Sequence, residues 1–245
     1  MSLKIFLNLP MSENILIIIP TYNEAENISQ IISSINKHLP KSHILVVDDN
    51  SPDQTSKIVK KLINQPKKNL FILERQNKTG LGAAYVEGFK WALEKKYNFI
   101  FEMDADFSHD PAELPKMIDL LKQGNDLIIG SRYKEGVNVI NWPLGRILLS
   151  YLASFYVRVI TGMPIKDPTA GYVGYKRKVL ENIELDKIKS LGYAFQIEMK
   201  YKSWISGYKL IEYPIIFKNR VRGKSKMDQS IFWEAIVSVI KLRFY

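Results

Sequence analysis

The chain has 245 residues, of which 46% are hydrophobic and 24% charged, and this length and composition suit a globular α/β protein with a substantial core. It contains no Cys, which excludes a disulfide framework and a thiolate metal site. No apolar run reaches the roughly 20 residues that a membrane-spanning helix needs.

The net charge of +10 is concentrated toward the C-terminus. Residues 200–245 hold ten Lys and Arg against three Asp and Glu, which places +7 of the charge there. A positive surface attracts phosphate groups, so nucleic acid, an anionic membrane and a phosphorylated substrate are all candidate partners. Simple solubility is the alternative explanation of this charge.

The N-terminal segment differs from the rest of the chain. Residues 1–10 hold one Lys and a short apolar patch, without the small-residue cleavage site of a signal peptide. We interpret them as an N-terminal extension. Because the remainder shows no repeat or linker, we expect residues 11–245 to form a single domain.

Strand and helix patterns alternate through the first half of the chain. We predict buried strands at residues 14–20, 44–47, 69–74, 98–103 and 126–130. Helices are predicted at residues 25–39, after Ser51, from Gly80 to residue 96, and from Pro111. Gly80 and Gly82 are interpreted as meeting a backbone requirement at the start of their helix.

This alternation indicates a mostly parallel, Rossmann-like sheet flanked by helices. Nucleotides bind to such sheets beyond the carboxyl ends of the strands. Tyr22, Asp49 and Asp104 each follow a predicted strand, so we expect them to meet at one edge of the sheet.

Two carboxylates, Asp104 and Asp106, end the fourth predicted strand. In an extended chain they would project to the same side. Buried together they would repel one another and lose hydration, and a divalent cation would relieve both costs. Mg²⁺ and Mn²⁺ favour such oxygen ligands and are often completed by substrate phosphates. The alternative is a solvated acidic turn.

The pattern changes after Arg132. We predict helices at residues 144–161, 192–206 and 229–244, a turn at 167–172 that leads into a short strand, an extended segment at 208–217 and a basic loop at 218–227. The first and last of these helices could lie in a membrane interface with their apolar faces down, or could pack on the sheet.

The motifs PTYNE, VVDDNS, TGLGAA, DADFSHDP, GSRY, PLGR, DPTAGY, GYAFQIEM and RVRGKSKM occur in this order over residues 14–228. As a set they resemble the family 2 glycosyltransferases, and within them the short polyprenol- or dolichol-phosphate mannose synthases. The resemblance implies a GT-A fold with C-terminal helices on the acceptor side, a sugar-nucleotide donor, Mg²⁺ or Mn²⁺, and inversion at the anomeric carbon.

The resemblance also assigns site residues. The residues that it implies for binding the donor are Pro20, Tyr22, Glu24, Val47, Asp49, Asp104, Ala105, Asp106, Arg220 and Lys226. It implies Arg132, Arg146 and Ser150 for the acceptor phosphate, Asp104, Asp106 and Ser108 for the metal, and Asp104, Asp106 and Arg132 for catalysis. Other members carry Gln at the position of Ser108, whose hydroxyl is a weaker ligand. Between Gln196 and Glu198, the sequence alone does not decide which faces the site.

The expected reaction is inverting transfer of mannose from GDP-mannose to a polyprenyl (dolichol-type) monophosphate, whose anionic oxygen needs no general base. A UDP-sugar donor, such as one that supplies glucose, or a sugar-hydroxyl acceptor is the alternative within the family. A basic module that binds nucleic acid or anionic lipid without catalysis is the alternative outside it, and we expect no nucleic-acid partner. We expect peripheral contact with the cytoplasmic face of a membrane, and a membrane-anchoring partner stays open.

Overall fold

The computed structural model describes residues 14–64, 69–188, 190, 192–219 and 229–244. The predicted N-terminal extension lies outside the described residues, and so do Arg220 and Lys226. All statements below concern the described part of the chain.

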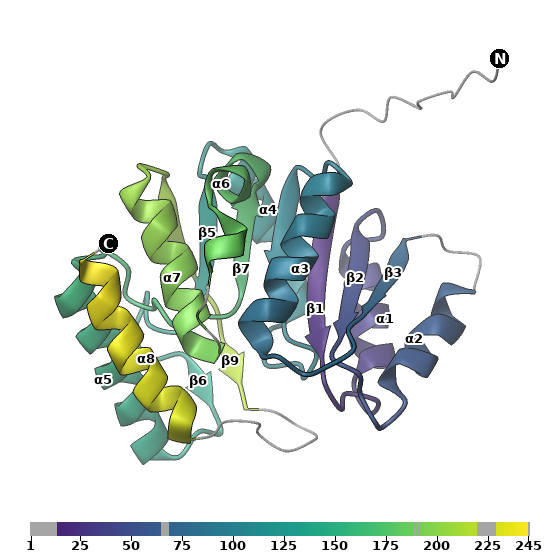
Figure 1. Ribbon diagram of the computed structural model, residues 1–245, viewed down its shortest axis with the longest axis horizontal. Coiled ribbons are helices and arrows are strands. Elements are labelled where there is room, and N and C mark those ends of the chain that lie inside the picture. The colour runs from purple at the N-terminus through teal and green to yellow at the C-terminus, as the bar shows by residue number, and fades with distance from the viewer. Residues whose placement is uncertain (1–13, 65–68, 189, 191, 220–228, 245) are drawn as a thin grey trace.

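A seven-stranded sheet forms the centre of the molecule (Figure 1). Its order is β3 (Leu70–Glu74), β2 (His43–Asp48), β1 (Ile15–Thr21), β4 (Phe99–Glu102), β7 (Val173–Lys176), β5 (Leu127–Ser131) and β8 (Leu210–Pro214). Only β7 runs antiparallel to its neighbours. The predicted α/β class with a mostly parallel sheet is therefore confirmed.

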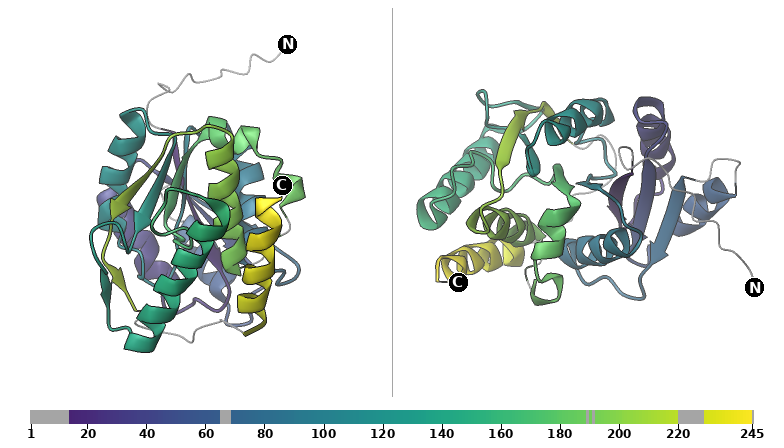
Figure 2. Two further views of the ribbon diagram at one scale, coloured as in Figure 1. Left: turned by 90° about the vertical axis from the view of Figure 1, so that its left-hand side faces the viewer. Right: turned by 90° about the horizontal axis from the view of Figure 1, so that it is seen from above.

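Helices cover both faces of this sheet (Figure 2). One face packs against α1 (Ile28–His38), α2 (Thr55–Ile63) and α4 (Leu114–Lys122). The other packs against α3 (Leu81–Glu94), α6 (Arg177–Asn182) and α7 (Gly192–Ile205). Short 3-10 turns at Pro111–Glu113 and Leu185–Lys187 complete the connections.

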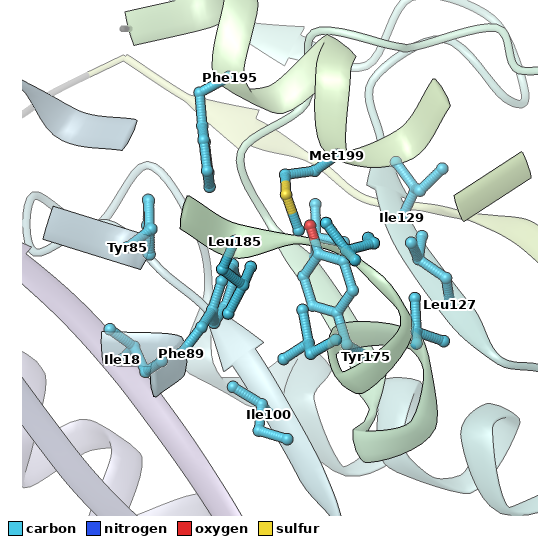
Figure 3. Close-up of a cluster of buried hydrophobic side chains, with 14 of the residues drawn as sticks. Ile18, Tyr85, Phe89, Ile100, Leu127, Ile129, Tyr175, Leu185, Phe195 and Met199 are labelled. Atoms are coloured by element: carbon cyan, nitrogen blue, oxygen red, sulfur yellow. The ribbon is translucent and has the colours of Figure 1, made fainter. Parts of the chain in front are cut away.

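The core follows from the alternation of side chains along β1. Leu16 and Ile18 enter one hydrophobic cluster, whereas Ile17 and Ile19 enter the cluster on the opposite face. Since both faces are covered, the strand reads as a continuous apolar run. Figure 3 shows the cluster under α3 and α7, where the Tyr85 and Phe195 rings stack 5.8 Å apart.

The glycines at the start of α3 serve the backbone, as predicted. Gly80 has φ +106°, which L side chains rarely adopt. A Cβ on Gly82 would lie 2.9 Å from the Cβ of Phe195 and 2.5 Å from the carbonyl oxygen of Ser190. Gly82 thus allows α3 to approach α7 closely.

The second half of the chain adds a small ribbon and two long helices. The predicted extended segment at 208–217 divides into β8 and β9 (Phe217–Lys218), and β9 pairs in parallel with β6 (Val139–Ile140). Strands of two residues carry no readable alternation, so the ribbon was not predicted. The helices α5 (Leu144–Thr161) and α8 (Gln229–Arg243) lie side by side beyond the β8 edge of the sheet (Figures 1 and 2).

Candidate active site

The strand ends converge at one edge of the sheet. Tyr22, Asp49, Asp104 and Arg132 lie at the carboxyl ends of β1, β2, β4 and β5, which all run in the same direction. The strand order reverses between β1 and β4, where ligand crevices form in open α/β sheets. Because β7 is antiparallel, the loop before it, residues 167–172, also reaches this edge.

Asp104 and Asp106 lie in a turn, not in an extended strand. Strand β4 ends at Glu102, and Phe107 adopts φ +62°. The expected alternation of the two carboxylates along a strand was therefore wrong. Asp106 is buried and its Oδ1 accepts the backbone N–H of Ser108 at 3.0 Å, whereas Asp104 is partly exposed. The turn still places both residues at the carboxyl end of β4, beside β1.

The buried His109 holds this turn through a hydrogen bond to its backbone. The backbone N–H of Asp104 donates to its Nδ1 at 3.1 Å, so the ring proton resides on Nε2. The ring stacks on Tyr172 with centroids 4.8 Å apart. Burial lowers the pKa of His109 to about 4, although the Asp106 carboxylate opposes this shift. The histidine is thus neutral, and its 4.0 Å approach to Asp104 Oδ2 is no ion pair.

The oxygen donors of this turn fit a divalent metal ion whose coordination a bound substrate would complete. Among the described residues, no group of three or more His, Cys, Asp and Glu is arranged to hold a metal ion. Two carboxylates and the buried Ser108 hydroxyl are nevertheless the oxygen donors found at Mg²⁺ sites, where substrate phosphates and water supply the rest. An all-protein cage is neither present in this part of the chain nor needed for such a metal.

The adjacent carboxylates after β2 have different surroundings. Asp48 accepts three hydrogen bonds, from Thr21 Oγ1 at 2.8 Å, from the Ser51 backbone N–H at 3.0 Å and from Ser51 Oγ at 2.6 Å. Its carboxylate therefore fixes the loop after β2 to β1. This contact network gives Asp48 a structural role, and ligand contact by Asp49 stays a prediction.

Asp49 is paired with Arg75, a buried residue that the sequence did not single out. Arg75 Nη1 donates to Asp49 Oδ1 at 2.6 Å and its Nε to Glu87 Oε1 at 3.0 Å, and Nη2 also bonds Thr79 Oγ1. Burial raises the pKa of Asp49, and the Arg75 guanidinium opposes this shift. The arginine directly follows β3, and that position was its only sequence signal.

The predicted donor-binding residues at the end of β1 and in the loop after it also lie at this edge of the sheet. Lys78 Nζ lies 4.3 Å from the centroid of the Tyr22 ring, and the buried Glu24 accepts Asn27 Nδ2 at 2.8 Å. The half-buried Pro20 pairs in register with Val47. The Val47 side chain is fully buried in the core, so only its backbone can face a ligand. In the turn after β4, Ala105 is likewise buried.

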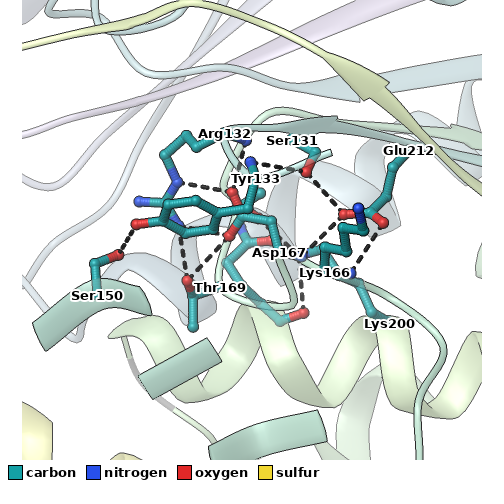
Figure 4. Close-up of polar contacts among 11 residues, drawn as sticks. Ser131, Arg132, Tyr133, Ser150, Lys166, Asp167, Thr169, Lys200 and Glu212 are labelled. Carbon is teal, nitrogen blue, oxygen red and sulfur yellow. Dashed lines mark hydrogen bonds and ion pairs between the residues drawn. The ribbon is translucent and has the colours of Figure 1, made fainter. Parts of the chain in front are cut away.

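Arg132 is held by a buried carboxylate, as Figure 4 shows. Asp167 Oδ2 accepts Arg132 Nε at 2.7 Å, and Oδ1 accepts Nη2 at 2.6 Å. Thr169 Oγ1 accepts the same Nη2 at 2.7 Å. Burial alone would raise the pKa of Asp167, but Arg132 holds it below its usual value. The guanidinium therefore has one fixed orientation.

The 167–170 turn is itself anchored from β8. Glu212 Oε1 accepts the backbone N–H of Asp167 at 2.9 Å and Ser131 Oγ at 2.8 Å, while Oε2 accepts the N–H of Lys166 at 2.9 Å (Figure 4). These bonds join β5, β8 and the turn at the site edge. No motif indicated this role for Glu212.

Arg146 and Ser150 lie one turn apart on α5, and both are half-buried. The guanidinium of Arg146 lies 4.0 Å from the centroid of the Trp142 ring, and its Nη1 donates to Asn219 Oδ1 at 3.0 Å. Ser150 Oγ accepts Tyr133 Oη at 2.8 Å. The structure thus brings Arg132, Tyr133, Arg146 and Ser150 to one end of α5.

A network of fully buried polar side chains connects β4, β7 and α7. Gln196 Nε2 donates to Glu102, whose other oxygen accepts Tyr175 Oη at 3.0 Å, and Lys200 Nζ donates to Gln196 Oε1 at 3.1 Å. Burial raises the pKa of Glu102 to about 7 and lowers that of Lys200 to about 8. Glu198 instead pairs with Lys202 at 3.0 Å. Of these two residues, Gln196 is therefore the one that contacts the end of β4.

Among the described residues, α5 is the one helix long and apolar enough to cross a membrane, and 17% of it is buried. One face of the helix carries large apolar side chains in the open: Leu144, Leu148, Tyr151, Leu152, Phe155 and Val159. The opposite face packs inward through Ser154, Val157 and Thr161. The helix therefore packs through one face only, and its contact with a membrane interface stays a prediction.

An open, mostly parallel sheet with acidic side chains at its switch point defines a nucleotide-binding α/β protein. Residues 16–184 match the glycosyl transferase family 2 model, and the chain belongs to this family. It is 44% identical to the polyprenol monophosphomannose synthase of Mycolicibacterium smegmatis over 93% of this chain and 86% of that one. It is 41% identical to the undecaprenyl-phosphate mannosyltransferase of Micrococcus luteus over 93% of each.

Solved structures share the fold. The glucosyl-3-phosphoglycerate synthase of Mycobacterium tuberculosis, solved with Mn²⁺ and UDP-glucose, superimposes with a TM-score of 0.70 at 15% identity, over 95% of this chain and 80% of that one. This agreement confirms the expected GT-A fold. The family match and the named relatives confirm the assignment of the chain as a glycosyltransferase.

Proposed function

We propose that this chain transfers mannose from GDP-mannose to a polyprenyl monophosphate with inversion at the anomeric carbon. The assignment of the acceptor and of the sugar rests on one observation. The chain is 44% and 41% identical, over 93% of its length, to relatives named for a polyprenyl phosphate and for mannose. The site supports the proposal, because carboxylates and the Arg132 guanidinium lie at the same edge of the sheet, and Arg132 and Arg146 lie near the same Trp142 ring.

The reaction needs two anions to approach one another. An oxygen of the lipid phosphate forms the new bond to C1 of mannose as the bond from C1 to the diphosphate breaks, and GDP leaves with the electron pair. The phosphate oxygen is already ionised, so no side chain has to remove a proton. The protein must instead offset repulsion with fixed positive charge and hydrogen-bond donors.

The carboxylates of the β4 turn would hold the metal in this scheme. Asp104 and Asp106, with the Ser108 hydroxyl beside them, would bind Mg²⁺ or Mn²⁺, which when bound neutralises the charge of the departing diphosphate. His109 keeps the turn in place without adding charge, because its imidazole is neutral. Asp104 then serves as an anchor for the donor and has no role as a base.

The nucleoside would lie between the β1 and β2 loops. Tyr22 offers an aromatic ring, and Glu24 and Asp49 offer carboxylate acceptors for the amino and imino edge of guanine. Arg75 fixes the Asp49 carboxylate that faces this space. Ala105 and the backbone at Pro20 and Val47 would line the remaining wall.

The donor is tested by the thermal shift that nucleotides produce. In the presence of Mn²⁺ we expect GDP to raise the unfolding midpoint and UDP to leave it nearly unchanged, since only the base differs between them. EDTA should reduce the GDP shift. A larger shift with UDP than with GDP would contradict the assignment of the donor.

The acceptor phosphate would bind at the start of α5. Arg146 and Ser150 face the site from the helix, and Arg132 contributes a guanidinium whose orientation Asp167 fixes. A guanidinium matches a phosphate with two parallel hydrogen bonds. The lipid chain would then leave the site along α5, whose outer face is apolar.

This outer face of α5 is proposed to contact the membrane that holds the lipid. Arg158 lies exposed beside the apolar stripe, where a cation would meet anionic head groups. A Leu152→Glu/Phe155→Glu variant should bind anionic vesicles at least about tenfold more weakly, since it replaces two membrane-facing apolar groups with charges. Vesicle co-sedimentation measures this change.

The matched control for this experiment is Ile205→Glu. Ile205 and Leu152 are each 51% exposed, but Ile205 lies on α7. Its variant should bind vesicles as the wild type does. Equal weakening by both variants would indicate a general charge effect and would contradict docking through α5.

A further inference from the structure

Lys200 is a fully buried cation on α7 with three acceptors. Its Nζ donates to the carbonyl oxygen of Ala170 at 2.6 Å and to Gln196, whose backbone oxygen and Oε1 both lie at 3.1 Å. These bonds match the three donors of an ammonium group. A buried charge is expensive to desolvate, and an apolar residue of similar volume often serves stability as well or better. Its position in the network points to a role beyond packing.

One branch of this network reaches the donor side. Lys200 can only donate, so it orients Gln196 with Oε1 toward the ammonium and Nε2 toward Glu102. Glu102 is the last residue of β4 and stands two residues before Asp104. Tyr175 Oη also donates to Glu102 at 3.0 Å, so this carboxylate keeps one hydrogen-bond donor that does not depend on Lys200.

The other branch reaches the acceptor side. The hydrogen bond from Lys200 to Ala170 there, at 2.6 Å, is shorter than the two bonds to Gln196, at 3.1 Å. Ala170 belongs to the turn in which Asp167 and Thr169 hold Arg132. Glu212 anchors the first residue of this turn, and Lys200 anchors the last. Figure 4 shows Lys200 and Glu212 in the same contact network as Arg132. Without Lys200, the buried carbonyl of Ala170 would lose its charged donor.

We infer that Lys200 is a positioning residue, which fixes the 167–170 turn and, through Asp167 and Thr169, the Arg132 guanidinium that faces the acceptor phosphate. The inference rests on the proposed function and deepens it. Lys200 touches no substrate in this assignment. Its effect is expected on the acceptor side, because Glu102 on the donor side keeps its own hydrogen bond from Tyr175.

The test is a kinetic comparison of Lys200→Met with the wild type, using GDP-mannose and a short polyprenyl monophosphate. We expect the KM for the lipid phosphate to rise about tenfold, since small misplacements of a binding group have effects of this size or larger. The KM for GDP-mannose should stay within about twofold of the wild-type value. Lys200→Gln, which keeps an N–H donor toward Ala170, should lie between the two.

Lys202→Met is the matched control, because Lys202 is a nearly buried lysine on the same helix that pairs with Glu198. It should leave the KM for the lipid phosphate unchanged. If Lys200→Met does not fold, Lys200→Gln carries the test alone. An unchanged lipid KM in folded Lys200 variants, or an equal rise in Lys202→Met, would overturn the role of Lys200. Absence of transfer by the wild type would instead contradict the proposed function.

Discussion

Asp167→Ala is expected to lower the free energy of unfolding by about 3–5 kcal/mol, because it leaves the buried Arg132 guanidinium without its carboxylate partner. Asp167 is fully buried and accepts the Nε, the Nη2 and the backbone N–H of Arg132. Thr169 alone cannot replace these bonds. Urea unfolding followed by circular dichroism measures the change.

Asp186→Ala provides the control for this prediction. Asp186 pairs with Lys90 at a strongly exposed position, and exposed ion pairs contribute only about 0–1 kcal/mol. The two variants therefore remove the same kind of side chain from surroundings of opposite character. A loss below about 1 kcal/mol in Asp167→Ala would contradict the buried pair.

The same pair predicts a dependence on pH. Burial alone would raise the pKa of Asp167, but Arg132 holds it below the ordinary value, so the folded state binds this proton more weakly than the unfolded chain. The stabilising contribution is therefore complete above the unfolded pKa of about 3.9 and disappears as pH falls through the lower folded value. The stability difference between wild type and Asp167→Ala should shrink in that acidic range and stay constant at neutral pH.

The positions of the site residues followed well from the sequence where strand ends set them. Apolar runs located β1, β2 and β4, and the rule for parallel sheets placed Tyr22, Asp49 and Asp104 at one edge. The conformation beyond a strand end was not predictable in this way. The turn at Asp104 depends on the buried His109 and on Asp106 bonding the Ser108 N–H, and neither contact follows from residue spacing.

Contacts between residues that are distant in the sequence could not be predicted either. Arg75, Asp167 and Glu212 determine how Asp49 and Arg132 are held, but each pair forms only after the sheet assembles. Lys200 is an extreme case, since a single lysine within a helix usually indicates a solvated face. Its burial depends on Ala170 and Gln196 meeting at the site edge, which only the tertiary structure defines.

Asp106→Asn is expected to reduce sugar transfer by roughly a hundredfold or more, because it removes one of two carboxylate charges that anchor the donor diphosphate through the metal. The amide oxygen of Asn can still accept the Ser108 N–H that Asp106 Oδ1 accepts now. The turn should therefore keep its conformation, and the unfolding midpoint without ligands should change little.

Asp126→Asn makes the same substitution at the opposite end of the sheet. Asp126 directly precedes β5 and is 8% exposed, close to the 6% of Asp106. Its carboxylate bonds Lys178 and the backbone N–H of Lys209, away from the site edge. This variant should retain transfer activity, so a loss specific to Asp106→Asn reports on the site.

The most direct measurement is transfer of labelled mannose from GDP-mannose to a polyprenyl monophosphate by the purified wild-type chain with Mg²⁺ or Mn²⁺, with Asp106→Asn beside it. We predict a labelled lipid product from the wild type, none with unphosphorylated polyprenol, and at most about one hundredth of the product from the variant. No product from the wild type, labelling that needs a UDP-sugar, or equal product from Asp106→Asn would contradict this account.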